Sequence, residues 1–399
     1  MKSNELLDDY VKSMAPFLYL PNCGNLGDLL IAEGARQYFK RLQVEWSEYD
    51  EKNVPEHYNL VFAGGAKITN EWGPNSKELK ILADKKIDTC LVLPHSINGP
   101  NDFLSALDER YVLVCREQTS LDYCKEHARG VRATPLCDDM AIALDLEQVE
   151  RDCVDLSTLT MSDLTYWEDR TAFRILKEGF ADDLRTRVYN SSVASEINGE
   201  VKRIAFLMRK DKEKAAMYQA EHTFDISAAW STMGRKMKFN ANILKAFSDA
   251  LKVADVVVTD RLHVAIMAWH SGREVYMLDN SYKKLSGVYK KSLSTEKRVH
   301  LLSDGLFTPE LDAAWAKLYG NYQSQQQMEL LKNVDAALKK HEEEVMKVLS
   351  LPELRRQRCR YRLKAFFSWG KRRAKYKELL RAVNAELNEV KKVMTKKSE

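Results

Sequence analysis

The sequence lacks the features that mark several common classes of protein. No apolar run approaches the roughly 20 residues that a membrane-spanning helix needs. The opening MKSNELLDDYVKS has neither the basic nor the apolar region of a signal peptide. The seven cysteines are scattered and form no CxxC pair, which argues against a disulfide framework. We therefore expect a protein of the reducing cytoplasm.

Metal-binding and nucleotide-binding signatures are missing as well. HxxxH, HExxH and a carboxylate cluster are absent, so we expect neither a metal ion nor another resident cofactor. GxxxxGK[ST] and the full GxGxxG are absent too, which leaves the glycines Gly24 and Gly27 as a weaker signal. They favour a turn in which backbone N–H groups approach an anion, although an ordinary strand–helix turn would have the same spacing.

Charge is distributed unevenly along the chain. The formal net charge is +4, yet residues 352–399 contain sixteen Lys and Arg against five Asp and Glu. In this tail, Phe366, Phe367 and Trp369 lie among the basic residues, and Leu380 begins an amphipathic 3-4 spacing. Such a helix is typical of docking on an anionic membrane surface. Packing on the body of the protein is the alternative, and nucleic-acid binding is less favoured because no recognisable binding fold accompanies the charge.

Short apolar runs alternate with helix-favouring segments through most of the chain. This alternation predicts an α/β protein with two Rossmann-like domains and a cleft between them, followed by a helical extension. We expect an N-terminal domain over residues 1–145 and a helical linker without a strand over 146–200. The C-terminal domain then spans 201–312, and the extension with its basic tail spans 313–399.

Most apolar runs end in polar or glycine residues. The carboxyl ends of parallel strands form the ligand-binding edge of an open α/β sheet, so these residues should converge on the cleft. Several arginines and lysines at one cleft imply a ligand with more than one negative group, because guanidinium binds carboxylate and phosphate bidentately. The predicted substrate-binding residues are Asn25, Gly64, Gly65, His95, Arg116, Arg209, Lys210, Arg261, Leu262, Asn280, Tyr282 and Lys284.

Two further residues are candidates for catalysis. His263 stands two residues after Arg261, at the expected start of a helix and beside the anion site, where it could move a proton near neutral pH. Asp28 follows the Gly24–Gly27 turn, where it can cap the next helix or act as a base toward a hydroxyl group. An isolated histidine is more often structural than catalytic, so the setting of His263 carries this hypothesis.

A set of motifs in fixed order resembles bacterial polysaccharide pyruvyl transferases. The set spans roughly residues 17–290, and its two most specific members are TDRLHVAIMAW and LDNSYKKLSGVY. The others are GNLGD, the Gly64–Gly65 pair, LPHSI, CREQTS, DDM and RKDKE. The resemblance is closest to enzymes of exopolysaccharide and capsule biosynthesis. Ala66 departs from the family's usual third glycine, and the helical tail has no counterpart in the family pattern.

The resemblance implies a fold similar to that of GT-B glycosyltransferases. It also implies phosphoenolpyruvate as donor, a sugar as acceptor and a cyclic pyruvate ketal as product. It assigns donor binding to Arg261 and His263, and with them to Arg116 and Arg209. The acceptor would be a glycan repeat unit on an undecaprenyl carrier, reached at the inner face of the cytoplasmic membrane through residues 352–399.

Two other functions stay open on the sequence. A sugar-nucleotide glycosyltransferase could use the same scaffold, because a fold does not determine chemistry and several arginines could also bind a diphosphate. A non-catalytic scaffold held at the membrane by its tail is the other.

Overall fold

The computed structural model describes residues 5–70, 77–211, 218, 222–231, 237–279, 284–302 and 306–324, with 377–379, 381 and 384 in the tail. The chain divides into one compact unit over residues 1–321 and a second over 322–399. The predicted membrane-docking segment 352–399 lies almost entirely outside the described residues. Within the described part of the chain, no helix is both long enough and apolar enough to span a bilayer.

Five parallel strands form the first sheet, in the order β2-β1-β3-β4-β5. This strand order is the flavodoxin-like form of the doubly wound fold. The sheet is covered on both faces, which is why strands such as YVLVC at residues 111–115 read as continuous apolar runs. The strands are β1 (Phe17–Leu20), β2 (Trp46–Glu48), β3 (Tyr58–Phe62), β4 (Ile87–His95) and β5 (Tyr111–Cys115).

Helices cover the two faces of this sheet through separate hydrophobic clusters. The helices α1 (Glu5–Met14) and α2 (Leu26–Leu42) pack on the face that carries Val61, Leu91 and Val112. The opposite face packs against α3 (Lys77–Leu82), α4 (Asn101–Ser105) and α5 (Gln118–His127). Alternate residues of each strand therefore enter different clusters, as the two-residue period of a strand requires.

The segment predicted as a strand-free helical linker is only partly helical. It contains α6 (Leu146–Arg151), α7 (Trp167–Lys177) and α8 (Phe180–Asn190). It then forms a strand, β6 (Ser192–Ile197), which pairs antiparallel with β7 (Glu200–Phe206) across a two-residue turn at Asn198 and Gly199. The expectation of no strand over 146–200 was wrong here. Strand β6 lies at the edge of its sheet and has three polar side chains, so its sequence lacks the continuous apolar run by which the other strands were predicted.

The second sheet has five strands in sequential order, β10-β9-β8-β7-β6, and is parallel except for β6. Its other strands are β8 (Val256–Thr259), β9 (Glu274–Leu278) and β10 (Val299–Leu302). Because crossovers are right-handed and the strands advance in one direction, the crossover helices fall on one face. Those helices are α9 (Asn240–Leu251) and α10 (Leu262–His270). Leu311, Ala314 and Leu318, from the helical residues 309–324, cover the other face.

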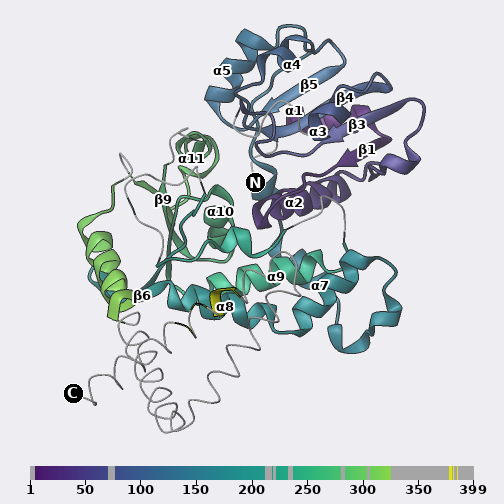
Figure 1. Cartoon of the computed structure of the whole chain (residues 1–399). Helices are drawn as coiled ribbons and strands as arrows, with labels where there is room; N and C mark the ends of the chain where they lie inside the picture. Colours follow the sequence, from purple (N-terminus) through teal and green to yellow (C-terminus); the bar gives the residue numbers. More distant parts are fainter. Residues whose placement is uncertain are drawn as a thin grey trace, which may run out of the picture. The chain divides into compact units, whose positions relative to one another are not determined.

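The two sheets share one hydrophobic core. Helix α2 lies between them and packs on α9 and α10, so that residues of both halves enter a single cluster (Figure 1). A polar contact joins the same helices, where Asn240 Nδ2 donates to Glu33 Oε1 at 2.7 Å. The molecule is thus a mixed α/β protein with two sheets, and α2 and α10 begin at the pocket described next.

Candidate active site

The turn between β1 and α2 presents a capped helix start to the pocket. Asn25 is the N-cap of α2, and its Oδ1 accepts from Gly27 N at 2.8 Å. Asp28 completes the capping box by accepting from Asn25 N with Oδ2 at 2.9 Å. A Cβ on Gly24 would lie 1.9 Å from that Asp28 oxygen, so any other residue there would displace the carboxylate. Of the two glycines noted in the sequence, Gly24 is therefore explained by the carboxylate held against the turn, and Gly27 by the close approach of His263.

The loop after β3 is held in place by hydrogen bonds to the buried side chain of His95. Its Nε2 accepts from Lys67 N at 2.7 Å and from Ile68 N at 3.2 Å, while Nδ1 lies 3.1 Å from Ala63 O. The ring must therefore be neutral, with its proton on Nδ1. Burial, together with nearby Arg116, lowers the pKa of His95 to about 3. His95 is fully buried and does not line the pocket, so its predicted substrate contact is replaced by support of the loop that carries Lys67.

Arg116 lies directly after β5 and is completely buried. Its Nη1 donates to Asp139 Oδ2 at 2.6 Å, and its Nε donates to Ser96 Oγ at 2.9 Å. Its Nη2 has no hydrogen-bond partner among the described residues, although it is buried. A buried guanidinium nitrogen left unpaired costs free energy, so an atom of this kind on a pocket wall indicates an anionic ligand.

His263 is the second residue of α10 and stands two residues after Arg261, the N-cap of that helix. Its Nε2 lies 3.6 Å from Asp139 Oδ2, beyond hydrogen-bond distance, and finds no hydrogen-bond partner in the described part of the chain. Burial lowers the pKa of His263, and the Asp139 carboxylate opposes that shift. A histidine held near an ionised carboxylate at a helix start is suited to proton transfer.

Two carboxylates orient the remaining arginines. Arg261 donates from Nε to Asp225 Oδ1 at 2.8 Å and from Nη2 to Asp211 Oδ2 at 2.9 Å. Asp211 also accepts from Arg209, at 2.9 Å from Nε and 3.0 Å from Nη2. Because each guanidinium is held by a carboxylate, both arginines keep one geometry and avoid the entropic cost of ordering when a ligand binds.

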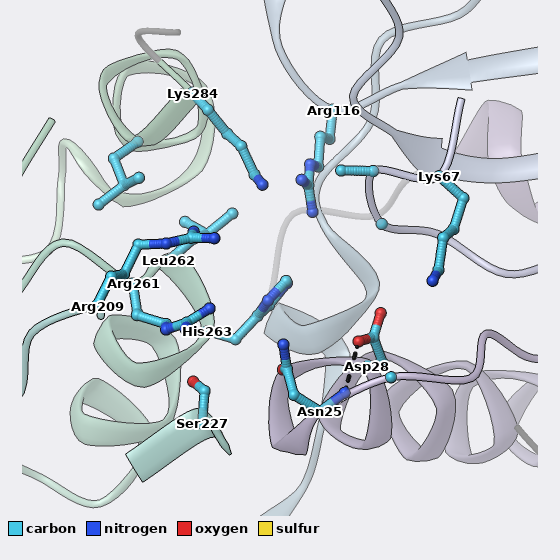
Figure 2. Close-up of a pocket in the computed structure, with 14 residues that line it drawn as sticks. Asn25, Asp28, Lys67, Arg116, Arg209, Ser227, Arg261, Leu262, His263 and Lys284 are labelled. Atoms are coloured by element: carbon cyan, nitrogen blue, oxygen red, sulfur yellow. Dashed lines mark hydrogen bonds between the residues drawn. The ribbon is translucent and has the colours of Figure 1, made fainter. Parts of the chain in front are cut away.

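These groups surround one pocket with about 750 Å³ of empty space, the open solvent at its mouth included. Figure 2 shows Arg116 and Lys284 above His263, Arg209 and Arg261 on one side, and Asp28 with Lys67 on the other. The lining residues are Gly24, Asn25, Asp28, Gly65, Ala66, Lys67, Arg116, Arg209, Ser227, Arg261, Leu262, His263, Lys284 and Leu285.

Most of the residues singled out in the sequence meet at this pocket. Like His95, Gly64 and Lys210 lie outside its lining: a Cβ on Gly64 would lie 2.7 Å from Pro94 O, so this glycine serves close packing between strand ends. Asn280 and Tyr282 lie outside the described residues, and their roles stay predictions.

Sequence reasoning gave no role to Asp139 and Lys67, two charged residues of the site, nor to Ser227 of the pocket lining. Asp139 follows the end of the first sheet in an Asp138–Asp139 pair, which was noted as part of a motif but given no role. Lys67 stands two residues after Gly65, in a segment that looked idiosyncratic. Lys67 lies five residues after β3 and Asp139 twenty-four residues after β5, so neither directly follows a strand as Arg116 does, and no strand-end signal marks them.

The residues that line the pocket are mainly cationic. Five of the lining residues, Lys67, Arg116, Arg209, Arg261 and Lys284, are basic, whereas Asp28 is the only acidic member of the lining in the described structure. The acidic partners Asp139, Asp211 and Asp225 stand behind the arginines. This arrangement favours an anionic ligand.

Gly27 offers a test of how closely the two sheets meet at this site. A Cβ there would lie 2.7 Å from His263 Nδ1 and 2.9 Å from His263 Cβ. The Gly27→Ala protein should gain helix propensity in α2, by up to about 1 kcal/mol, but lose ligand response because His263 must move. The unfolding temperature without ligand measures the change in stability. Its increase on addition of an anionic ligand measures the ligand response. Gly320→Ala, where a Cβ meets nothing within 4 Å, is the control. A Gly27→Ala protein that keeps the wild-type ligand response would contradict this geometry.

No group of three or more His, Cys, Asp or Glu side chains able to hold a metal ion occurs in the part of the chain that the structure describes.

Comparisons with known proteins place this chain in a family. The sequence model of the polysaccharide pyruvyl transferase family matches residues 25–282, which is more than half of the chain. No curated protein matches the chain. A crystal structure of a functionally uncharacterised protein from Klebsiella pneumoniae is similar at 25% sequence identity and a TM-score of 0.55. The match covers 76% of this chain and 100% of that one.

Proposed function

Because this chain belongs to the polysaccharide pyruvyl transferase family, we propose that it moves the pyruvyl group of phosphoenolpyruvate onto two hydroxyls of one sugar. The product is a cyclic pyruvate ketal within a polysaccharide repeat unit, and inorganic phosphate is released. The observation that carries the donor assignment is the cluster of five basic side chains and His263 around one pocket, with Arg116 Nη2 unpaired among the described residues.

The proposed donor fits this cluster by charge. Phosphoenolpyruvate carries a carboxylate and a phosphate close together. A guanidinium group can bind two oxygens of either anion at once. Arg209 and Arg261 are held by Asp211 and Asp225, and Arg116 is held by Asp139, so three guanidinium groups are oriented before a ligand arrives. The start of α10 adds the positive end of a helix dipole, carried by Leu262 and His263.

The proposed reaction needs one acid, one base and cationic support. Protonation of the methylene carbon of phosphoenolpyruvate leaves a cationic centre at C2, and a sugar hydroxyl adds there as it loses its proton. The C2–O bond to phosphate then breaks, phosphate leaves, and the second hydroxyl closes the ketal as it loses its own proton. His263 is the proposed acid near the donor, and the arginines stabilise the phosphate charge that develops. No resident cofactor is required by this chemistry.

Asp28 is the proposed base for the acceptor. Its Oδ2 is engaged by Asn25 N, and the glycines Gly24 and Gly65 beside it leave the carboxylate open to the pocket. This wall belongs to the first sheet, whereas Arg209, Arg261 and His263 come from the second. We therefore propose a GT-B-like division, with the acceptor on the N-terminal half and phosphoenolpyruvate mainly on the C-terminal half.

Two measurements test the proposed function together. Phosphoenolpyruvate at about 100 times its Kd should stabilise the protein by roughly 2.7 kcal/mol, and sugar nucleotides should not. Incubation with phosphoenolpyruvate and a synthetic capsule-type glycan should release phosphate and raise the glycan mass by pyruvate minus water. Stabilisation by UDP-sugars, with glycosyl transfer to the glycan, would instead make the protein a glycosyltransferase. If neither transfer occurs and neither donor binds, the remaining hypothesis is that the protein is a non-catalytic scaffold.

We further propose that the acceptor is linked to an undecaprenyl carrier and that residues 352–399 dock on the inner face of the cytoplasmic membrane. Their excess of basic residues and interleaved aromatics supports this proposal. Deletion of 352–399 should abolish sedimentation with anionic vesicles, because each Lys or Arg near such a surface contributes about 1 kcal/mol. Neutral vesicles are the control, and undiminished sedimentation of the shortened protein with anionic vesicles would refute the proposal.

A further inference from the structure

One buried carboxylate joins the two halves of the pocket. Asp139 is 1% exposed and lies in the segment that follows the first sheet. Its Oδ1 accepts from Ala141 N at 2.8 Å, and its Oδ2 accepts from Arg116 Nη1 at 2.6 Å. The same Oδ2 lies 3.6 Å from His263 Nε2, which comes from the second sheet. Three points of contact thus set the position of this carboxylate.

The two basic groups that face Asp139 are the ones with unpaired nitrogens. Arg116 Nη2 and His263 Nε2 are both buried, and neither has a hydrogen-bond partner among the residues described. Both side chains also line the pocket. Asp139 itself does not line the pocket, so it acts on a ligand only through these neighbours.

We infer that Asp139 is a positioning residue for the proposed transfer: it holds Arg116 with Nη2 directed at the donor and keeps His263 available as an imidazolium acid. This inference rests on the proposed function for its chemical meaning. The geometry on which it stands is that of one carboxylate between a fully buried guanidinium and a buried imidazole.

Electrostatics supports this role. Burial raises the pKa of Asp139, but Arg116 and His263 outweigh burial and hold the pKa of this carboxyl well below its usual range. Asp139 is therefore ionised at neutral pH. Burial, with Arg116 and Lys284 in the same direction, lowers the pKa of His263 below its usual value, and Asp139 opposes this shift and so increases the imidazolium fraction. The other charged groups that line the pocket with His263 are Asp28, from the first turn of α2, and Lys67, Arg209 and Arg261.

The sign of the expected pH effect follows from these contacts. An opposite charge within about 4–6 Å shifts a pKa by about 1–3 units. The Asp139 carboxylate, 3.6 Å from His263 Nε2, therefore favours imidazolium. With Asp139→Asn, His263 loses that support while Arg116 and Lys284 continue to lower its pKa. The pH above which His263 is neutral therefore moves down. If imidazolium is the acid, the rate of the variant should fall at neutral pH and recover as the pH is lowered.

The test combines a pH–rate profile with NMR titration of His263 in the free protein, the resonance being assigned by its loss in His263→Gln. Asp139→Asn should lower both midpoints by about 1–3 units. Asp138→Asn is the matched control, because the adjacent Asp138 binds Lys291 and Ser292 instead. Its midpoints should equal those of the wild type. Wild-type midpoints in a folded Asp139→Asn protein would overturn the inference.

A measurement without donor and a second variant make the two possible failures distinguishable. The NMR titration needs no donor, so a wild type that forms no ketal would refute the proposed function, whereas an unmoved His263 midpoint would refute the role of Asp139. Should Asp139→Asn fail to fold, Asp139→Glu keeps the charge. It should hold the His263 midpoint near the wild-type value and raise the donor KM by misplacing Arg116. A lowered midpoint with the charge retained would count against the inference.

Discussion

Replacement of His263 by glutamine should lower the rate of pyruvyl transfer by about 10²–10⁴-fold, the range expected when a general acid is lost. Glutamine retains a polar group of similar reach but cannot supply a proton. The loss should fall on kcat more than on the KM for phosphoenolpyruvate, because the arginines that bind the donor anions are unchanged. Steady-state assay of phosphate release with a glycan acceptor measures both constants.

The fold should survive this substitution. His263 Nε2 makes no hydrogen bond to the described residues, so its removal leaves no new buried partner unpaired. His57→Gln is the matched control, since His57 is an exposed histidine that pairs with exposed Asp88. Its rate should equal that of the wild type. If His263→Gln turned over at the wild-type rate with an unchanged pH profile, the acid would have to be another group.

Replacement of Arg116 by methionine should have the largest effect on stability. Asp139 would be left as an unpaired charge with 1% exposure, and breaking a buried ion pair in this way costs about 3–5 kcal/mol. Donor binding should be lost as well, because Arg116 Nη2 is the unpaired cationic nitrogen on the pocket wall. Denaturant unfolding and a thermal shift with phosphoenolpyruvate measure the two effects separately.

A second substitution separates stability from binding. Arg116→Met combined with Asp139→Asn removes the guanidinium and the carboxylate closest to it, so part of the lost stability should return. Buried Glu117, 3.6 Å from Arg116 Nε, still loses its cationic partner. Donor binding should not return, because no cation has been restored. Arg110→Met is the control: Arg110 pairs with Asp108 at the surface, and such pairs contribute about 0–1 kcal/mol. A double variant that binds phosphoenolpyruvate as the wild type does would remove Arg116 from the donor site.

Local patterns in the sequence were sufficient for much of the first half. The run YVLVC became β5, and the polar residues after it, Arg116 and Glu117, lie at the strand end as expected. Asp28 was expected to cap α2; the N-cap is Asn25, and Asp28 completes the capping box from the third helical position. The start of α10 directly after Arg261 was likewise readable from adjacent residues.

Other features were out of reach because they depend on contacts between distant positions. His95 has the same place after an apolar run as Arg116, yet one is turned beneath a loop and the other reaches the pocket. Strand β6 is polar at the sheet edge, so its pairing with β7 and not its pattern makes it a strand. A sequence shows which side chains stand at strand ends, but not the direction in which each one points.

The sequence by itself determined the family, the two runs of strands and the stretch that brings Arg261 and His263 to a helix start. Each of these depends on periodicity or on neighbours in the chain. Only the tertiary structure decided that Arg116, Asp139 and His263 meet, and that two of their nitrogens are buried without partners in the described part of the chain. The reason is physical: burial and ion pairing arise when α2 and α10 pack between the two sheets, and no local pattern encodes the distance between residues more than a hundred positions apart.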